Sequence, residues 1–224
     1  MTTTGPKRWF FDAWSRIYDF PVVQIATYRP VHNAVLRVLH GHLPRRVLDL
    51  GCGTGQLALR LTDELPDVRI VGCDFSVGML RHARARTRRA RWVCGDAGRL
   101  PFCDDAFDAI VSTEAFHWFP DPAAALAECF RVLAPGGRLL VALVNTPATV
   151  VSDLMYYGSR VAGEPFYWPT TRDMRARVET AGFRVERQRR IYRLPGFLLP
   201  PVLTCALKPV HQRTRHAAHR KAHR

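Results

Sequence analysis

The order of apolar and polar positions predicts an α/β protein in which strands and helices alternate. Short apolar runs typical of buried strands recur along the chain, and segments with helical periodicity separate them. Parallel strands need crossover connections, which are usually right-handed helices, so this order predicts a doubly wound sheet. The expected strands cover residues 46–50, 68–73, 90–94, 107–112, 137–144, 183–189 and 202–209.

Helical periodicity and capping residues mark the segments between these strands. Asp121 followed by Pro122 is typical of a helix start, and Thr170 with Asp173 forms the pattern of a capping box. Gly182 is expected to end the last helix. The expected helices cover residues 56–65, 76–87, 122–134 and 172–182, and in the second of them Met79, Leu80, Ala83 and Thr87 should face inward.

Four segments are expected along the chain. Residues 1–44 read as a helical lead-in, 45–207 as the main domain, 145–182 as an insert capping the substrate site, and 208–224 as a basic tail without fixed structure. In the lead-in, Phe10, Trp14, Ile17 and Tyr18 share one helical face, which would serve core packing or a lid over a ligand.

Composition supports a folded protein without a membrane span. Of 224 residues, 47% are hydrophobic and 23% are charged, which suits one domain with a sizeable core. No apolar run reaches the length of about 18 residues that a transmembrane helix needs, and the N-terminus lacks the apolar stretch of a secretory signal. The six cysteines include no CxxC pair, which disfavours a zinc site or a disulfide framework. We therefore expect a cytoplasmic protein.

The formal net charge of +14 is unusual for such a domain. Basic residues gather at 81–91, at 184–193 and in the tail from Lys208. These clusters could be solvated faces, or they could attract an anionic surface such as lipid headgroups or nucleic acid. The sequence leaves both interpretations open.

A glycine-rich turn, "VLDLGCGTGQ" (47–56), follows the first expected strand. Its glycines Gly51, Gly53 and Gly55 would let the backbone approach a ligand closely. Their spacing is GxGxG and not the GxGxxG of dinucleotide folds. Asp49 would repel a pyrophosphate but would attract an ammonium or a sulfonium. The turn therefore favours a cationic cofactor without phosphate.

Acidic residues also end the next two strands. Asp74 can accept hydrogen bonds from both hydroxyls of a ribose. Asp96 can accept from an adenine amino group, the Ala97 N–H can face a ring nitrogen, and Met79 can pack on the adenine face. Each acid taken singly could instead cap a turn, but three at consecutive strand ends favour a nucleoside site.

With these motifs in place, the chain resembles class I S-adenosylmethionine-dependent methyltransferases. The resemblance rests on "VLDLGCGTGQ", "VGCDFSVGML", "GDAGRLPFCDDAFDAIVS" and "RVLAPGGRLLVAL", and it covers about residues 45–145. The most similar branch acts on small molecules and includes the ubiquinone/menaquinone C-methyltransferases. The resemblance implies a Rossmann-like sheet of seven strands, mostly parallel with the last strand antiparallel, and S-adenosyl-L-methionine as cofactor.

The resemblance also implies roles for single residues. It places Asp49 and the glycine turn at the methionine end of the cofactor, Asp74 at the ribose and Asp96 with Ala97 at the adenine. "RIYD" (16–19) resembles an element that closes over the cofactor, so Tyr18 is a candidate contact. The predicted cofactor-binding residues are Asp49, Gly51, Cys52, Gly53, Gly55, Asp74, Phe75, Met79, Asp96, Ala97 and Ser112.

The fourth expected strand leads into "STEAFHWFPDP" (112–122), which should lie beside the transferred methyl group. The quinone enzymes carry a "GLRN"-type sequence at this place, so this chain departs from them here. His117 is a candidate general base or a packing residue, and Glu114 could hydrogen-bond the substrate or the cofactor. Trp118 is expected to pack near the adenine or to wedge the turn that follows it. The sequence lacks the motifs of adenine N-methylation and cytosine C5 methylation.

The predicted function is methyl transfer to a small-molecule or lipid-like acceptor. The apolar wall of the acceptor site would come from aromatic residues, and the arginine clusters could hold the enzyme at an anionic membrane. The alternatives are an RNA or protein methyltransferase, although no nucleic-acid-binding module is evident, or a catalytically inactive cofactor-binding partner protein. The candidate aromatic residues are Tyr156, Tyr157, Phe166, Tyr167 and Trp168.

Overall fold

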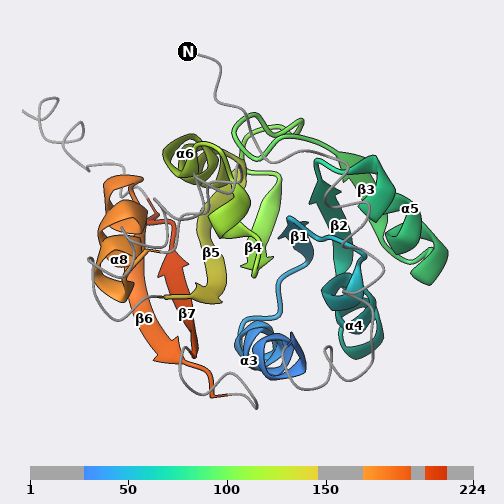
Figure 1. The fold of residues 1–224 in the computed structure, drawn as a ribbon, viewed down its shortest axis with the longest axis horizontal. Helices are drawn as coiled ribbons and strands as arrows, with labels where there is room; N and C mark the ends of the chain where they lie inside the picture. The colour runs from blue at the N-terminus through green and yellow to red at the C-terminus, as the bar shows by residue number, and fades with distance from the viewer. Residues whose placement is uncertain (1–27, 146–168, 193–199, 211–224) are drawn as a thin grey trace, which may run out of the picture.

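The fold is built on one seven-stranded sheet with the order β3-β2-β1-β4-β5-β7-β6 (Figure 1). The computed structural model describes residues 28–145, 169–192 and 200–210. β1 to β5 are parallel, and β7 is antiparallel to both of its neighbours, as expected for this class. The strands are β1 (Arg46–Leu50), β2 (Arg69–Asp74), β3 (Arg91–Cys94), β4 (Phe107–Thr113), β5 (Leu133–Val144), β6 (Arg184–Arg190) and β7 (Pro201–Leu207).

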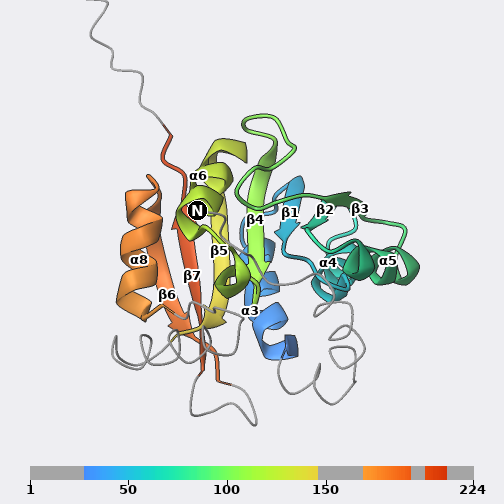
Figure 2. The same ribbon diagram turned by 45° about the horizontal axis from the view of Figure 1, so that its top comes forward.

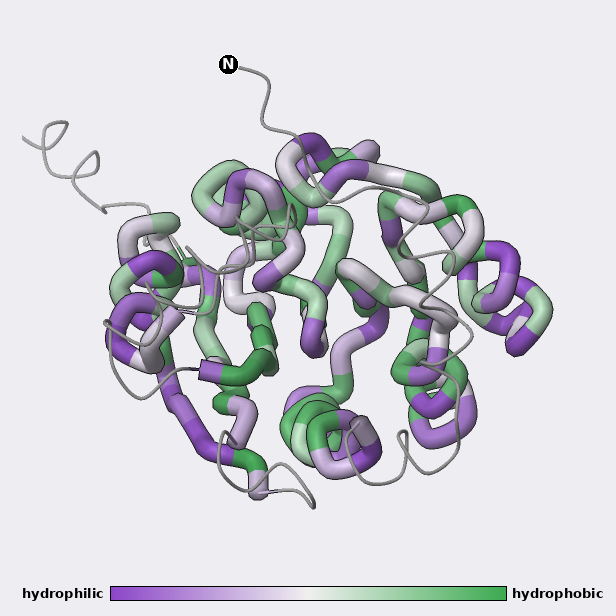
Figure 3. The backbone as a smooth tube through the Cα atoms, in the orientation of Figure 1, coloured by the Kyte–Doolittle hydropathy of each residue, from purple (hydrophilic) through white to green (hydrophobic). Residues whose placement is uncertain are grey.

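Helices cover both faces of the sheet, so its central strands are apolar on both sides. The described helices are α3 (Arg29–His40), α4 (Gln56–Glu64), α5 (Val77–Arg86), the 3-10 helix η2 (Phe116–Trp118), α6 (Pro122–Val132) and α8 (Thr171–Thr180). One buried cluster joins α3 and α4 to the sheet, and a second joins α6 and α8 to the opposite face (Figure 2). Apolar positions accordingly line the central strands (Figure 3).

The strand order reverses between β1 and β4, which lie side by side. Asp49 of β1 pairs with Gly72 of β2 on one side and with Val111 of β4 on the other. In an open parallel sheet, the crevice outside the carboxyl ends of the strands at this reversal is the usual ligand site. The segments that follow β1, β2 and β4 are therefore expected to form the ligand site.

Local capping chemistry starts the helices where the sequence predicts. Ser76 accepts a hydrogen bond from the Met79 N–H, and Asp121 accepts from the N–H groups of Ala123 and Ala124. Thr170 and Asp173 form the reciprocal capping box at the start of α8. The predicted caps at Asp121 and Thr170 are confirmed, and the cap at Ser76 is an addition to them.

The end of α6 differs from the prediction. The helix ends at Val132, two residues before the expected end, and residues 133–136, which the sequence pattern predicts to end the helix and lead into the strand, begin β5 instead. The cause is long-range pairing, because the Gly136 N–H donates to the Lys208 carbonyl and the Lys208 N–H donates to the Gly137 carbonyl. A partner more than seventy residues away in the chain thus overrides the local helical pattern.

Several predictions lie outside the described residues. They concern the N-terminal helical face with Tyr18, most of the 145–182 insert with its aromatic residues, and the tail beyond residue 210. Within the described ranges, no helix has both the length and the hydropathy needed to cross a membrane.

Candidate functional site

The glycine turn after β1 is held by its own backbone. The Gly51 N–H donates to the Cys73 carbonyl at 2.8 Å, and the Cys52 N–H donates to the same oxygen at 3.2 Å. The Gly53 N–H donates to Asp74 Oδ2 at 2.8 Å, and the Gly55 N–H donates to the Cys52 carbonyl at 2.9 Å. A phosphate-binding loop instead points such N–H groups at its ligand. With these four donors already used, the turn suits a cofactor without phosphate.

The three glycines of the turn are needed for different structural reasons. All three adopt positive φ angles, of 71°, 52° and 78° for Gly51, Gly53 and Gly55. A Cβ on Gly51 would lie 2.4 Å from the Cβ of Ala115, and one on Gly55 would lie 2.6 Å from the Trp92 ring. A Cβ on Gly53 would meet nothing within 4 Å. Gly51 and Gly55 therefore permit packing within the protein, whereas Gly53 leaves open space beside the turn.

A small pocket opens at the end of β1, between the turn, α3 and α4. Its lining residues come from four segments of the chain that the sheet brings together. They are Tyr28, His32, Asp49, Gly51, Cys52, Thr54, Gln56, Leu57 and Thr113.

Asp49 is the one charged residue among those that line this pocket. Its side chain is 1% exposed, and its Oδ2 atom has no hydrogen-bond partner among the described residues. Burial, with a smaller contribution from the negative charge of Asp74, raises the pKa of Asp49 to about 7. A buried carboxylate without a full set of partners is costly. A cationic ligand at this position would relieve that cost.

Asp74 ties the turns after β1 and β2 together. Its Oδ2 accepts from the Gly53 N–H at 2.8 Å, and its Oδ1 accepts from the Ser76 N–H at 2.9 Å. Burial raises its pKa, and the backbone donors at Ser76, Gly53 and Phe75 oppose that rise. Each carboxylate oxygen can accept a further hydrogen bond, so Asp74 can both fix the two turns and receive ribose hydroxyls.

The predicted adenine contacts lie at the ends of β2 and β3. Asp96 is exposed, and its Oδ1 accepts from the Gly98 N–H at 2.9 Å, so it caps its own turn. Ala97 and Met79 are buried, at 8% and 5% exposure. The Cys94 thiol lies 3.6 Å from the Phe75 carbonyl and links the turns after β2 and β3. The capping and ligand-binding interpretations of Asp96 are compatible, because the turn engages Oδ1 and a ligand could bind Oδ2.

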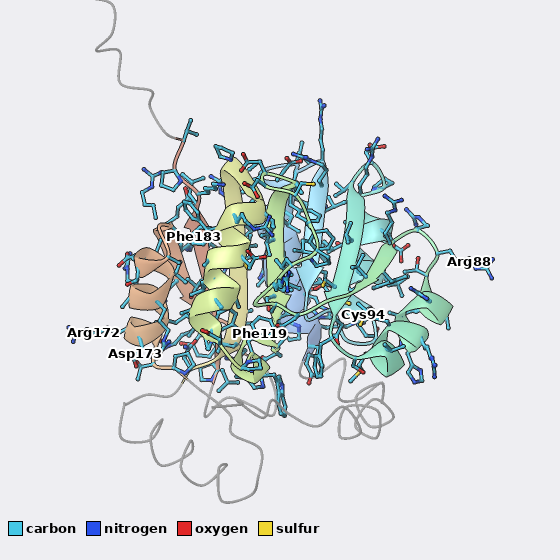
Figure 4. The ribbon with its side chains drawn as sticks, turned by 90° about the horizontal axis from the view of Figure 1, so that it is seen from above. Arg88, Cys94, Phe119, Arg172, Asp173 and Phe183 are labelled. Atoms are coloured by element: carbon cyan, nitrogen blue, oxygen red, sulfur yellow. The ribbon has the colours of Figure 1, made fainter. Side chains whose placement is uncertain are left out.

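The segment after β4 bends sharply into the site. Glu114 has a φ of 53°, which is rare for a residue with a side chain, and its N–H donates to the Ala142 carbonyl at 2.7 Å. The bend brings Ala115 against Gly51 and begins the single turn of η2. Phe119 lies at the same end of the molecule as Cys94 of β3 (Figure 4). The segment thus forms a wall beside the glycine turn.

His117 and Trp118 lie on this wall, with ring centroids 5.1 Å apart. Nδ1 of His117 is buried, and burial lowers the pKa of this imidazole to about 3. The imidazole is therefore neutral at physiological pH. Neutral imidazole can hydrogen-bond a substrate, but a group with this pKa is a weak general base.

The structure does not bring the Ser112 side chain to the pocket. Successive residues of a strand point to opposite faces of the sheet. Asp49 pairs with Val111, so Val111 and Thr113 share its face, and Thr113 lines the pocket. Ser112 pairs with Val141 of the opposite buried cluster, and its Oγ is buried without a hydrogen-bond partner among the described residues. The Thr113 side chain therefore lines the pocket, whereas the side chain of the predicted residue Ser112 lies on the opposite face of the sheet.

Sequence reasoning also missed the contribution of α3. Tyr28 and His32 line the pocket, although the resemblance pointed to Tyr18, which lies outside the described residues. Thr54 and Gln56 belong to the glycine turn and could have been included from their position alone. No local signal marked His32, because its neighbours read as the apolar face of a helix.

Comparison with known proteins agrees with this geometry. Residues 48–141 match the family model of the methyltransferase domain. The chain is 45% identical over 117 residues to a demethylmenaquinone methyltransferase of Thermus thermophilus, which covers 50% of this chain and 53% of the relative. It is 36% identical over 172 residues to a malonyl-[acyl-carrier protein] O-methyltransferase of Geobacter sulfurreducens, covering 71% of this chain and 64% of the relative.

A solved structure extends the likeness across the fold. A chain of the Haloferax volcanii complex between the Trm112 methyltransferase activator and a methyltransferase superposes with a TM-score of 0.72 at 25% identity, covering 89% of this chain and 98% of that one. The present chain spans about half to three fifths of the length of the first curated relatives it matches.

The matched residues resemble class I methyltransferase domains, and in particular those of the quinone C-methyltransferases, whose cofactor is S-adenosylmethionine. The site fits this cofactor on its own evidence. The unpartnered Oδ2 of Asp49 suits the cationic amino-acid end, and the glycine turn does not offer its used N–H groups to a phosphate.

Proposed function

We propose that this protein transfers a methyl group from S-adenosylmethionine to a small-molecule or lipid-like acceptor. The observation that carries the proposal is the buried Asp49 carboxyl group, whose Oδ2 has no hydrogen-bond partner among the described residues and which lies beside a glycine turn with four N–H groups already used within the protein. The matched methyltransferase domain supports the same chemistry.

Three groups of this chain would hold the cofactor, which supplies an activated methyl group on a sulfonium. Asp49 would bind the ammonium of its amino-acid end, and Asp74 would accept from the ribose hydroxyls. Ala97 and Met79 would border the adenine, with Asp96 near its amino group. The carboxylates of Asp74 and Asp96 can accept these hydrogen bonds in addition to the ones that they already accept from the backbone.

The protein's part in the reaction would be alignment in a dry site. Methyl transfer is an in-line displacement, so holding the nucleophile and the methyl carbon in register supplies much of the acceleration. The wall formed by residues 114–119 is fixed by the bend at Glu114 and by its contact with the glycine turn. We propose that Glu114 and His117 face the acceptor, with His117 as a neutral hydrogen-bonding or packing group, since its pKa of about 3 disfavours the general-base role.

The nature of the acceptor is supported by the relatives. One relative is named for demethylmenaquinone and another for the malonyl group of an acyl-carrier protein, so the named acceptors are a quinone and a carrier-bound acyl group. The "EAFHWF" sequence departs from the quinone enzymes at the wall itself. A small acceptor with an apolar body and a shape different from a quinone is therefore proposed. The aromatic residues expected to cover it, at 156–168, lie outside the described residues.

Peripheral attachment to an anionic membrane is a further part of the proposal, supported by charge alone. Hydrophilic positions gather on α5 at one end of the sheet and on α8 and β6 at the other (Figure 3). Arg88 and Arg172 extend outward at these two ends (Figure 4). Part of the arginine cluster serves the fold instead, since Arg89 pairs with Asp63 at 3.0 Å. Equal co-sedimentation with anionic and neutral vesicles would exclude the attachment.

The proposed function is tested in two steps. Calorimetry with S-adenosylmethionine should show binding to the protein and loss of that binding in the Asp49→Ala variant. Transfer of a radiolabelled methyl group should then be measured on a panel of acceptors that includes demethylmenaquinone, free fatty acids, acyl carrier proteins and RNA. Absence of cofactor binding refutes the proposal, and labelling of RNA or protein alone would assign the activity to a macromolecular acceptor.

A further inference from the structure

His32 differs from the other residues of the pocket because its buried imidazole has no evident role in packing or hydrogen bonding within the described part of the fold. It lies one turn into α3 and is 4% exposed. The surrounding buried face of α3 is apolar, with Val31, Val35 and Leu36. The imidazole makes no hydrogen bond within the described parts of the chain, so a leucine would serve packing at least as well.

The position of α3 explains how His32 reaches the site. Only five residues join the end of α3 to the start of β1, so α3 packs back along the sheet and its first turn lies at the carboxyl end of β1. Tyr28 and His32 are four residues apart and share one face of the helix, with ring centroids 6.4 Å apart. Both rings line the pocket that contains Asp49 and Gly51.

The charge state of His32 suits a pocket that already contains a carboxylate. Burial, and then the positive charge of Arg60 on α4, lower the pKa of His32 to about 3. The neutral ring offers one N–H donor and one acceptor. No Lys or Arg occurs among the described residues that line the pocket, so no cation there competes with a ligand's ammonium for Asp49.

The amino-acid end of the methyl donor carries both an ammonium and a carboxylate. Asp49 can bind the ammonium of the donor. The carboxylate of the donor would lie beside Asp49 and would need a hydrogen-bond donor that does not itself form an ion pair with Asp49. A neutral imidazole meets both requirements, because it donates a hydrogen bond without forming an ion pair. His32 lies on α3, which lines the same pocket as the glycine turn.

We infer that His32 binds the carboxylate of the donor's amino-acid end, with the Tyr28 ring holding the imidazole in place. His32 is then a cofactor-binding residue in its own right, next to the Asp49 position already assigned. The inference rests on the methyl-donor site of the proposed function. It does not depend on which acceptor the protein methylates.

Two ligands that differ only at the amino-acid end test the inference. S-adenosylhomocysteine carries the ammonium and the carboxylate, whereas 5′-deoxy-5′-methylthioadenosine lacks both. In the His32→Leu variant we expect the affinity for S-adenosylhomocysteine to fall about tenfold to a hundredfold, as for loss of a hydrogen bond to a charged group. The affinity for methylthioadenosine should change less than about twofold. His32→Gln, which keeps a donor, should recover part of the loss.

The matched control is His82→Leu, because His82 is exposed on α5 and away from the pocket. It should leave both affinities unchanged. Equal losses for the two ligands in His32→Leu, or no loss for either, would overturn the inference. If the wild type binds neither ligand, the proposed function itself fails, so the two failures are distinguishable.

A measurement on the unmodified protein covers the case in which His32→Leu does not fold. The 15N resonances of the His32 ring should shift on addition of S-adenosylhomocysteine and should stay in place on addition of methylthioadenosine. Shifts of similar size with both ligands would contradict a contact with the amino-acid end.

Discussion

The affinity for S-adenosylmethionine should depend on the protonation of Asp49. In the folded protein its pKa is about 7, because the carboxyl group is buried and lies near Asp74. A bound ammonium favours the carboxylate, so the pKa falls in the complex and binding releases a proton. The affinity is therefore greatest above the pKa of the free protein and is lost as the pH falls through it.

The size of the effect follows from this pKa. The ionised fraction of a group with a pKa of about 7 is about one half at pH 7 and about one tenth at pH 6. The affinity should thus fall about fivefold over that interval and approach a tenfold loss per unit below it. His32, with a pKa of about 3, stays neutral throughout.

Titration calorimetry between pH 7.5 and 5.5 measures this dependence, and repeating it in buffers of different ionisation enthalpy counts the protons released. The pH range stays below the pKa of the ligand's own ammonium, which is about 7.7–8.0 for an α-amino group. In the Asp49→Asn variant the affinity should be lower and should lose most of its pH dependence. A flat profile for the wild type, or an equally steep one for Asp49→Asn, would refute the reasoning.

The carboxyl group of Asp49 should also lower the free energy of unfolding of the ligand-free protein. Its pKa is raised relative to the unfolded chain, so the folded state binds the extra proton, and stability is lost as the pH rises through about 7. Asp49→Asn should therefore stabilise the ligand-free protein at pH 8, by an amount on the order of a few kcal/mol. Urea unfolding at pH 8 and pH 5 measures this, and the gain should shrink at the lower pH.

Four further substitutions test the geometry of the site. Gly51→Ala should cost more than Gly53→Ala in urea unfolding, because both oppose a positive φ at about 1–2 kcal/mol but only the first also collides with Ala115. Glu114→Gly should raise stability by up to about 1 kcal/mol by removing strain at a φ of 53°, while turnover falls if the bend positions the wall. His117→Ala should lower kcat less than about tenfold, and a larger loss that follows a single ionisation would restore the general-base role.

The elements of the fold were largely predictable because their signals are local. Apolar runs, capping residues and glycines act over a few neighbouring residues, and they placed the strands and the starts of the described helices. The β5 start was mispredicted because its backbone partner, Lys208, lies far along the chain. Asp49, Asp74 and the glycine turn were identifiable for a similar reason, since each follows directly from a strand end.

The sequence by itself determined the alternation of strands and helices along the chain, the glycine turn and the acids that end the first three strands, because period, capping and spacing are properties of adjacent residues. Only the tertiary structure decided that Thr113 and not Ser112 faces Asp49, since one residue of register exchanges the two faces of a strand. It also brought His32 from α3 into the pocket and set the pKa values of Asp49 and His117. Burial and charge at these positions come from segments distant in the chain, and no local pattern contains them.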